Sequence, residues 1–511
     1  MNEGCEGMGT EPRRISMNRI MIVYVLGIFL LQPLFWMSPE HEAKIRNAFL
    51  WPAVFTAFCA ILYAVWKNPK NAGRLAVSLL LPVWLLITNT LNGDPYLLLN
   101  QKFIMGVFLT FGVCFPVFIL AEPGWLARGL KATGWFAVLL FAGIACIGVF
   151  LAFTGRTYTS PLSDRAIGIF DGRLYVFTLH PNEVACLFVG VLFWAAYLIA
   201  AARRPLSRVL LAAACLCLYA GIALTDSTTG KLSTSVGLGL TVMLLLKRYG
   251  RGKNPLKAVY TVIIACAVAV IAMAGFSGVV RAASYALRRP KPALTIRMPE
   301  PIVTPVSQER EQSVDMPNSI ESEGEPSSDA PDSVETKTEP SSDMPDSVEA
   351  EALDVVPVAR DMRPNFGTFS DRTSIWKAGL DAIRNHPRIL LMGMTDGQAA
   401  RVPKTALNRD IYHMHNAWME MLLLGGIPGL LLYVLFCVQL VAQCVKVYFN
   451  KKQPFSTRML AIGPAVLLIH CLMEIYPAFA GTAMDMVFAL LAGAFTAMSR
   501  HAQRVPTDGA A

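Results

Sequence analysis

Two histidines and an asparagine stand together immediately before a long apolar run, in IYHMHNAWMEMLLLGGIPGLLLY (411–433). His413 and His415 are one residue apart, which in an extended chain turns both rings to the same face and suits a metal ion. The only further ligand close in the sequence is Asp410, so we expect no metal site here. Two other interpretations stay open. The polar residues can mark the end of a membrane helix, or His415 can act as a general base with Asn416 beside it.

A second candidate for chemistry is Arg372, within FSDRTSIWKAGLDAIRNHP (369–387). The apolar spacing of this stretch predicts an amphipathic helix, capped by Ser370 or Asp371 and ended by Pro387. The residues expected near its buried face are Ile375, Trp376, Leu380 and Ile383. Arg372 falls in the first turn, where a cation is unfavourable against the helix dipole. It is therefore either an ordinary solvated arginine or a residue whose charge serves something other than helix stability.

The elements that must position these residues are membrane helices. The chain has 511 residues, of which 54% are hydrophobic and 16% are charged, whereas soluble domains carry about a quarter charged residues. The apolar residues form blocks of roughly 20, the length that a helix needs to cross the hydrocarbon core, so we expect an all-α polytopic membrane protein with about 12 spans. The expected spans are 18–37, 48–66, 75–93, 103–121, 135–153, 183–202, 208–225, 232–246, 258–280, 417–447, 459–477 and 481–498.

Lysines and arginines set the expected orientation, because they favour the cytoplasmic side of a membrane protein. The basic loops include KNPKNAGR (67–74), RRPLSR (203–208), KRYGRGKNPLK (247–257) and KVYFNKKQPFSTR (446–458). With these loops inside, both termini are cytoplasmic, and the segments 154–182 and 281–416 face outward. The basic inner loops account for the net charge of +9, so we expect no nucleic-acid partner.

The segment 281–416, between the ninth and tenth expected spans, is far longer than a connection requires. Its first part, 281–365, contains an acidic fourteen-residue repeat over 313–354 and is too polar to form a core, so we expect disorder. An inserted tether and a cation-binding tail are both open for it. The second part, 366–416, is expected to be helical and to carry the catalytic loop. The flanking domains are the transmembrane bundle 1–280 (spans one to nine) and 417–511 (spans ten to twelve and the tail).

Three motifs resemble those of one family of bacterial membrane enzymes. His415-Asn416, nine residues and then GIPGL (426–430) match the pattern of the O-antigen ligases and their polymerase relatives. Arg372-xxx-Trp376 followed by HPRILLMG (386–393) resembles the segment that precedes it in that family. Upstream, GRLYVFTLHPNEVACL (172–187) resembles the stretch before a span that contributes an arginine and a Pro-Asn pair. Where many members carry an SRG motif after span seven, TDSTTGKLSTS (225–235) has Lys231 as its only cation.

The resemblance implies a glycosyltransferase that moves a glycan from a polyprenyl-diphosphate carrier to an acceptor hydroxyl, on the outer face of the bacterial cytoplasmic membrane. Arg173 and Arg372 would neutralise the diphosphate leaving group, because guanidinium forks match phosphate oxygens. His415 would take the proton of the acceptor hydroxyl. Lys231, Asn416, His180, Asn182 and Trp376 are the candidates for substrate binding. The predicted outer loops lack an Asp-x-Asp motif, so we expect a metal-independent, inverting reaction without a cofactor.

Several alternatives stay open. His180 can instead cap the sixth span, and Trp376 can pack the helix rather than stack on sugar. Ligation to a lipid core, polymerisation of repeat units and transfer to a protein hydroxyl share this scaffold by resemblance. A transporter or flippase also suits about 12 spans, although such proteins place ionisable residues near the midplane. Here the few charges within the expected spans lie near the ends, at Glu420, Glu474 and Asp485.

Overall fold

The computed structural model describes residues 55–92, 106–159, 166–170, 172–176, 180–249, 255–287, 369–407, 413–475 and 483–504. All of them belong to one compact unit, which comprises Met1–Arg289 and Ala359–Ala511. The described residues are mostly helical (85%), as expected. The first predicted span (18–37) and the acidic repeats (313–354) lie outside the described residues.

Six described helices are long and apolar enough to cross a membrane. They are α6 (Pro123–Thr154), α7 (Pro181–Ala201), α8 (Pro205–Leu224), α9 (Thr228–Tyr249), α10 (Pro255–Leu287) and α14 (Ala417–Phe449). Shorter apolar helices coincide with other predicted spans, namely residues 55–67, α3 (Lys70–Leu91), η2 (Phe108–Cys114) with α5 (Phe115–Leu120), α15 (Phe455–Leu460) with α16 (Ile462–His470), and α17 (Ala483–Arg504). The total of 12 spans stays a prediction.

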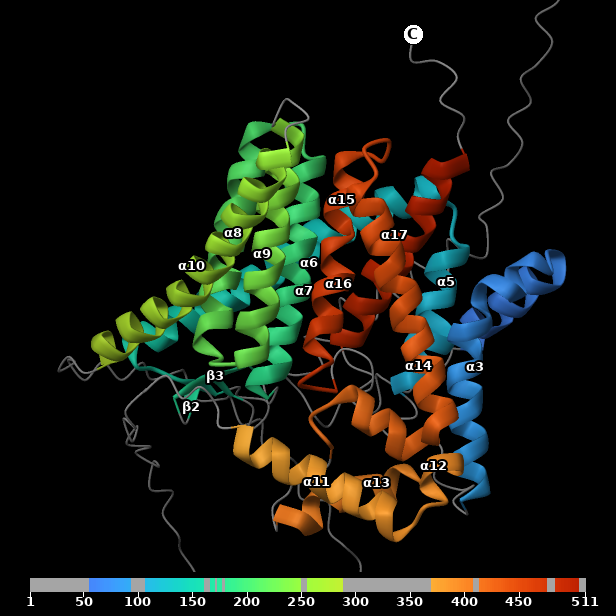
Figure 1. The fold of residues 1–511 in the computed structure, drawn as a ribbon. Coiled ribbons are helices and arrows are strands. Elements are labelled where there is room, and N and C mark those ends of the chain that lie inside the picture. The colour runs from blue at the N-terminus through green and yellow to red at the C-terminus, as the bar shows by residue number, and fades with distance from the viewer. Residues whose placement is uncertain are drawn as a thin grey trace, which may run out of the picture. The chain divides into compact units, whose positions relative to one another are not determined.

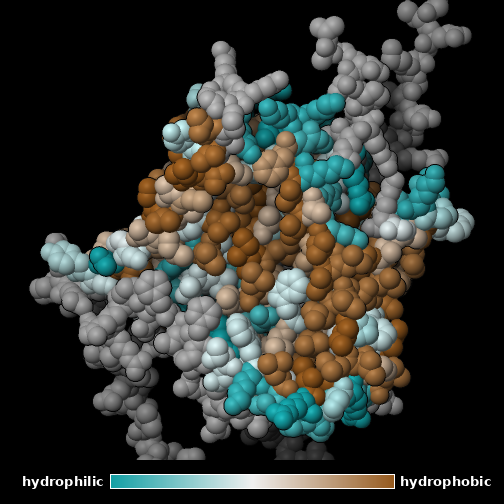
Figure 2. All heavy atoms as spheres, viewed as in Figure 1, coloured by the Kyte–Doolittle hydropathy of each residue, from teal (hydrophilic) through white to brown (hydrophobic). Residues whose placement is uncertain are grey.

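The sides of the helices carry exposed apolar side chains, such as Leu216, Val270 and Ile271. Figure 2 shows hydrophobic residues over much of the visible side of the molecule, with hydrophilic residues gathered near its top and bottom. An apolar band of this kind between polar ends is the surface that a bilayer covers. Most of the long helices in Figure 1 run between the top and the bottom of the view.

A small antiparallel sheet is the one departure from the all-α expectation among the described residues. It has the order β1 (Tyr158–Thr159), β2 (Ala166–Phe170) and β3 (Arg173–Val176). Ile167 pairs with Val176, and Phe170 pairs with Arg173. The strands are too short to give a clear period-two pattern, so the sequence suggested only a loop here. The pairing fixes Arg173 at the start of β3, close to the first turn of α7.

Three helices lie across the same end of the molecule as this sheet: α11 (Phe369–Asn385), α12 (Ile389–Met392) and α13 (Asp396–Leu407) (Figure 1). The predicted amphipathic helix is thus confirmed as α11, in which Ile375 and Ile383 are buried. Leu380 was wrongly placed near the buried face, since it is 53% exposed. Gly379 lies so close to Met414 that an added Cβ would be 2.6 Å from the methionine methyl group. This close approach brings the middle of α11 beside the residues that precede α14.

Gly426 breaks the regular geometry of α14, with φ 61° and ψ −164°. An added Cβ would lie 2.7 Å from the carbonyl oxygen of Leu390 in α12, so the kink also provides the space that α12 fills. Only glycine adopts this conformation readily. Gly426 thus combines a helix kink with a close approach to a second helix.

Main-chain carbonyls at this kink accept hydrogen bonds from neighbouring segments. The Leu424 carbonyl cannot bind a Pro428 N–H, since proline has none, and it accepts a hydrogen bond from Thr88 Oγ1 (3.2 Å). Trp84 Nε1 donates to Gly425 O at 2.7 Å, and Met394 N donates to Leu423 O at 2.8 Å. These three hydrogen bonds attach both α3 and the segment between α12 and α13 to α14 at the kink.

Basic residues collect at the opposite end of the bundle. The ammonium group of Lys247 lies 4.1 Å from the Phe449 ring centroid, and the Arg248 guanidinium lies 4.2 Å from that of Phe455. Arg458 Nε donates to Tyr448 O at 2.9 Å. The helices α9 and α14 begin at the end that carries α11 and finish at this basic end. Three basic side chains thus lie where α9 and α14 finish.

Candidate functional site

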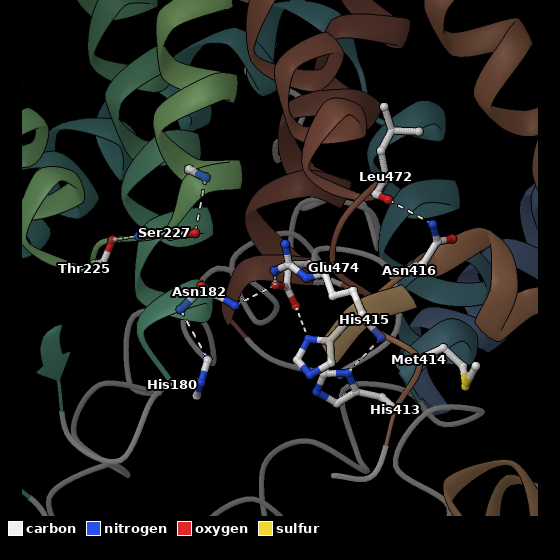
Figure 3. A network of polar contacts seen from close by, with 12 residues as sticks. His180, Asn182, Thr225, Ser227, His413, Met414, His415, Asn416, Leu472 and Glu474 are labelled. Carbon is white, nitrogen blue, oxygen red and sulfur yellow. Dashed lines mark hydrogen bonds and ion pairs between the residues drawn. The ribbon is translucent and has the colours of Figure 1, made fainter. Parts of the chain in front are cut away.

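A buried carboxylate, Glu474, lies at the centre of a polar network at the α11 end of the bundle (Figure 3). The predicted span 459–477 does not continue as one helix, because α16 ends at His470 and the chain turns through Glu474. Glu474 Oε1 accepts hydrogen bonds from Arg372 and Asn182, each at 2.6 Å. Its other oxygen, Oε2, lies 2.9 Å from His415 Nδ1. A buried charge requires such partners, and here a cation, an amide and an imidazole supply them.

Arg173 joins the network through Asn182. A terminal nitrogen of its guanidinium donates to Asn182 Oδ1 at 2.7 Å, and its Nε donates to Thr225 O at 2.9 Å. Burial lowers the pKa of Arg173, while the nearby carboxylate of Asp226 acts in the opposite direction. Arginine stays charged through such shifts, because its unperturbed pKa exceeds 12. Asn182 therefore connects two cations, one directly and one through Glu474.

His415 has a backbone conformation that is uncommon for a residue with a side chain, with φ 49°. Three sets of hydrogen bonds hold its two neighbours in the chain, Met414 and Asn416. Glu420 Oε2 accepts from Met414 N at 2.8 Å, and Trp376 Nε1 donates to Met414 O at 2.9 Å. Asn416 Oδ1 caps α14 by accepting from the N–H groups of Trp418 and Met419. Strained residues held in this way are common at functional sites.

The side chain of Asn416 is occupied on both sides. Its oxygen caps α14, and its Nδ2 donates to Leu472 O at 2.9 Å. These bonds tie the start of α14 to the turn that carries Glu474. Asn416 was predicted to stand beside the base or to bind substrate, and its contacts favour a part in positioning His415 through the backbone.

Trp376 likewise has a structural contact. Its indole nitrogen binds Met414 O, and its ring is partly buried against the apolar core. This arrangement favours the packing interpretation over sugar stacking. It also sets the distance between α11, which carries Arg372, and the residues around His415.

His180 is the N-cap residue of α7, which is the alternative role that the sequence left open for it. Its ring accepts from Asn182 N at 3.4 Å, and Glu183 Oε2 accepts from His180 N at 3.2 Å, which completes a capping box. The box fixes the first turn of α7 and so the position of Asn182. The structure thus gives His180 a part in building the site without a contact to Glu474.

Lys231 lies in the first turns of α9 and forms a close ion pair with Asp226. Asp226 has a positive φ of 52°, and its main chain follows Thr225, whose carbonyl binds Arg173. The charge of Lys231 is therefore compensated locally. This cation is less available to an anion than Arg173 or Arg372, in line with its lower rank in the sequence analysis.

His413 packs against His415, with ring centroids 4.1 Å apart. Its Nδ1 accepts a hydrogen bond from His415 N at 3.3 Å. Burial lowers the pKa of His413 to about 3, and the neighbouring His415 acts in the same direction. The His413 ring is therefore neutral near pH 7.

The structure brings four of the predicted residues together, Arg173, Arg372, Asn182 and His415, and adds Glu474 as their common partner. Glu474 stands 59 positions after His415 and 102 positions after Arg372. Its signal in the sequence was a single carboxylate within an apolar stretch, which in a membrane protein points to function. That signal was used only to argue against a transporter.

The network can hold a proton acceptor and an anion at the same time. A histidine with one ring nitrogen bound to a buried carboxylate offers the other nitrogen as a base. Among the described residues no hydrogen bond reaches His415 Nε2. Arg173 and Arg372 carry two positive charges against the one negative charge of Glu474, so the network has a surplus positive charge. Such a site favours a phosphate or carboxylate group beside the imidazole.

A family model described as "O-Antigen ligase" matches residues 211–434. The site residues within the matched range are Lys231, Arg372, Trp376, His413, His415 and Asn416. No curated protein matches the chain significantly. The family match confirms the resemblance that the motifs indicated, and with the apolar helices it indicates an integral membrane protein.

Proposed function

Because the chain is related to the O-antigen ligases, we propose that it is a membrane glycosyltransferase that moves a glycan from a polyprenyl-diphosphate carrier to an acceptor hydroxyl. The observation that carries this proposal is the gathering of His415, Arg372 and Arg173 around Glu474 and Asn182. A base beside two guanidinium groups is what such a transfer requires. The acceptor must lose a proton, and the diphosphate must gain negative charge.

His415 acts as the general base. Glu474 Oε2 faces Nδ1 at 2.9 Å, so the favoured tautomer carries hydrogen on Nδ1 and a lone pair on Nε2. Nε2 takes the proton of the acceptor hydroxyl as its oxygen attacks the anomeric carbon. The resulting imidazolium is stabilised by the adjacent carboxylate. A base placed in this way contributes about 10²–10⁴ to the rate.

Arg173 and Arg372 bind the diphosphate of the donor. Each guanidinium uses part of its five N–H donors within the network, Arg372 toward Glu474 and Arg173 toward Asn182 and Thr225. The remaining donors can meet phosphate oxygens bidentately. As the bond between the anomeric carbon and the phosphate oxygen breaks, that oxygen gains charge, and the cations stabilise it. The displacement inverts the anomeric centre and proceeds without a metal or cofactor.

The site faces the outside of the cytoplasmic membrane in this proposal. It lies at the start of α7, α9 and α14, whereas Lys247, Arg248 and Arg458 lie at their other ends or beside them. Basic residues favour the cytoplasmic side. Both termini are then cytoplasmic, and the donor diphosphate lies at the outer headgroup level, beside α11. The bilayer lipids surround the apolar band.

The test uses purified protein in vesicles, lipid-linked glycan and acceptor membranes. We expect transfer by the unaltered protein and a loss of about 10²–10⁴ in rate for His415→Ala, with normal insertion and thermal stability. His386→Ala, in the exposed turn after α11, is the matched control and should transfer normally. A single added glycan identifies a ligase, and a ladder identifies a polymerase. Transfer to a protein hydroxyl identifies an O-oligosaccharyltransferase. Full activity of His415→Ala contradicts the assignment of the base, and an inactive unaltered protein would favour a transporter or flippase.

A further inference from the structure

We propose that His413, His415 and Glu474 form a binding site for a divalent transition-metal ion of the Zn²⁺ type, and that the bound ion switches off glycan transfer. The binding half of this inference stands on the geometry of the three side chains alone. The inhibition half rests on the proposed function. The sequence offered only a His-x-His pair without a third ligand, and the structure supplies Glu474 from a distant turn.

The three side chains converge closely enough to share one ion. One ligand atom from each lies within 4.8 Å of the other two, and His415 Nδ1 is 2.9 Å from Glu474 Oε2. With Zn–N and Zn–O bonds of about 2.0–2.1 Å, ligand atoms at tetrahedral positions are about 3.3 Å apart. The site therefore needs a small closing movement of His413 and almost none of the other two. Two imidazoles and a carboxylate are a common zinc ligand set, and a water molecule can fill the fourth position.

The carboxylate can bind an ion without releasing Arg372. Arg372 and Asn182 both bind Oε1, whereas Oε2 faces the imidazole of His415. An ion between Oε2 and the two rings therefore takes the place of a proton rather than that of the guanidinium. The nearby positive charge of Arg372 weakens binding compared with an isolated triad. We accordingly infer a reversible, inhibitory ion rather than a permanent one.

His413 is suited to be the second nitrogen ligand. Its ring is only partly exposed, and the ring centroid lies 4.1 Å from that of His415. The transfer reaction proposed above assigns no task to this ring, so its placement beside the base remains to be explained by another role.

The ion would stop catalysis by changing the tautomer of His415. In the free site, Nδ1 carries hydrogen and Nε2 carries the lone pair that accepts a proton. An ion on Nδ1 displaces that hydrogen, and the neutral imidazole then keeps its single hydrogen on Nε2. The lone pair needed by the acceptor hydroxyl is thereby lost. A bound metal ion also neutralises the charge of Glu474, which stabilises the imidazolium of His415 in the free site.

The binding test needs no glycan. Protein carrying a tag without histidine is titrated with Zn²⁺ in detergent, and Co²⁺ is used separately for its tetrahedral absorption bands. We expect one ion per chain for the unaltered protein and for His386→Ala, and an affinity at least about tenfold lower for His413→Ala. His413→Gln, which keeps an acceptor for His415 N, serves if the alanine variant does not fold. Absence of saturable binding, or binding unaffected by both His413 variants, overturns the site.

The inhibition test compares each protein with its own metal-free rate. Zn²⁺ should abolish transfer by the unaltered protein, and a chelator should restore it. The His413 variants should need at least about tenfold more Zn²⁺ for the same inhibition. Stoichiometric binding without inhibition overturns the inhibitory half. If the unaltered protein transfers no glycan under any condition, the proposed function fails, whereas the binding result still decides the metal site.

Discussion

Replacing Glu474 by glutamine tests whether the buried carboxylate makes His415 an effective base. The substitution keeps the shape of the side chain and removes its charge. A hydrogen bond to a charged group contributes about 1.5–3 kcal/mol, which corresponds to roughly 10- to 150-fold in rate. The bare Coulomb attraction across 2.9 Å is ~6 kcal/mol at an effective dielectric constant of about 20. That value is an upper limit, because His415 is 18% exposed and solvent screens the pair. We expect kcat to fall by about 10- to 150-fold.

The assay measures initial rates of glycan transfer at saturating donor, with thermal unfolding as the control for folding. Glu183→Gln is the matched variant, since its carboxylate caps α7 through His180 N rather than facing the base, and its rate should stay near that of the unaltered protein. In the double variant Glu474→Gln with His415→Ala, the second change should add little, because the two residues act as one unit. Full activity of Glu474→Gln refutes the reasoning. A double variant whose loss equals the product of the two single losses refutes it as well.

Three further outcomes follow from the same geometry. Arg372→Lys keeps one charge and loses the fork, so transfer should fall by about tenfold or more while the unfolding midpoint changes little, and retained activity would count against phosphate binding by this side chain. Gly426→Ala puts a Cβ 2.7 Å from Leu390 O at a φ of 61°, so the free energy of unfolding should fall by about 1–3 kcal/mol. Gly429→Ala is its control, because the added Cβ would meet only side chains, with the nearest atom at 3.3 Å. Equal stability of the two variants would show that alanine at position 426 is not strained. Burial lowers the pKa of His413 to about 3, below its ordinary value of about 6.5. The unfolded chain therefore takes up a proton first, and stability in a chelator should fall as pH decreases from about 6.5 toward 3. His413→Gln should flatten that curve, and parallel curves for the two proteins would show that His413 is not the cause.

The sequence was most informative where local physics decides the structure. Long apolar blocks must be helical in lipid, so α6 to α10 and α14 were foreseeable from length and hydropathy. The spacing around Arg372 predicted α11, because its buried residues recur with the helical period. Leu380 was misplaced because a residue at the edge of an apolar stripe is buried only if a neighbour covers it. The small sheet was missed because its strands are shorter than any pattern that alternation can reveal.

Contacts between distant segments account for the rest of what the sequence could not show. The role of Glu474 depends on α16 ending at His470, which brings the carboxylate beside two residues from other parts of the chain. Asn182 appeared as half of a capping motif, and its bridge between Arg173 and Glu474 emerges only in three dimensions. The ion pair of Lys231 with Asp226 is local, with the two residues five positions apart, but it was also hidden because the sequence does not specify where either side chain points.

The attachment of α11 and α12 to α14 has a consequence for how this chain can change in length. Main-chain groups form the joint at the kink, through Met394 N and the close approach of Gly426 to α12, and Trp376 fixes α11 to Met414 O. None of these contacts involves a residue before position 369. Arg372 is therefore anchored from its C-terminal side, and the chain that leads to it can gain or lose residues without moving the guanidinium. A segment such as the acidic repeat over 313–354 can then be acquired by duplication at little cost, since longer loops add only slowly to the entropy of closure.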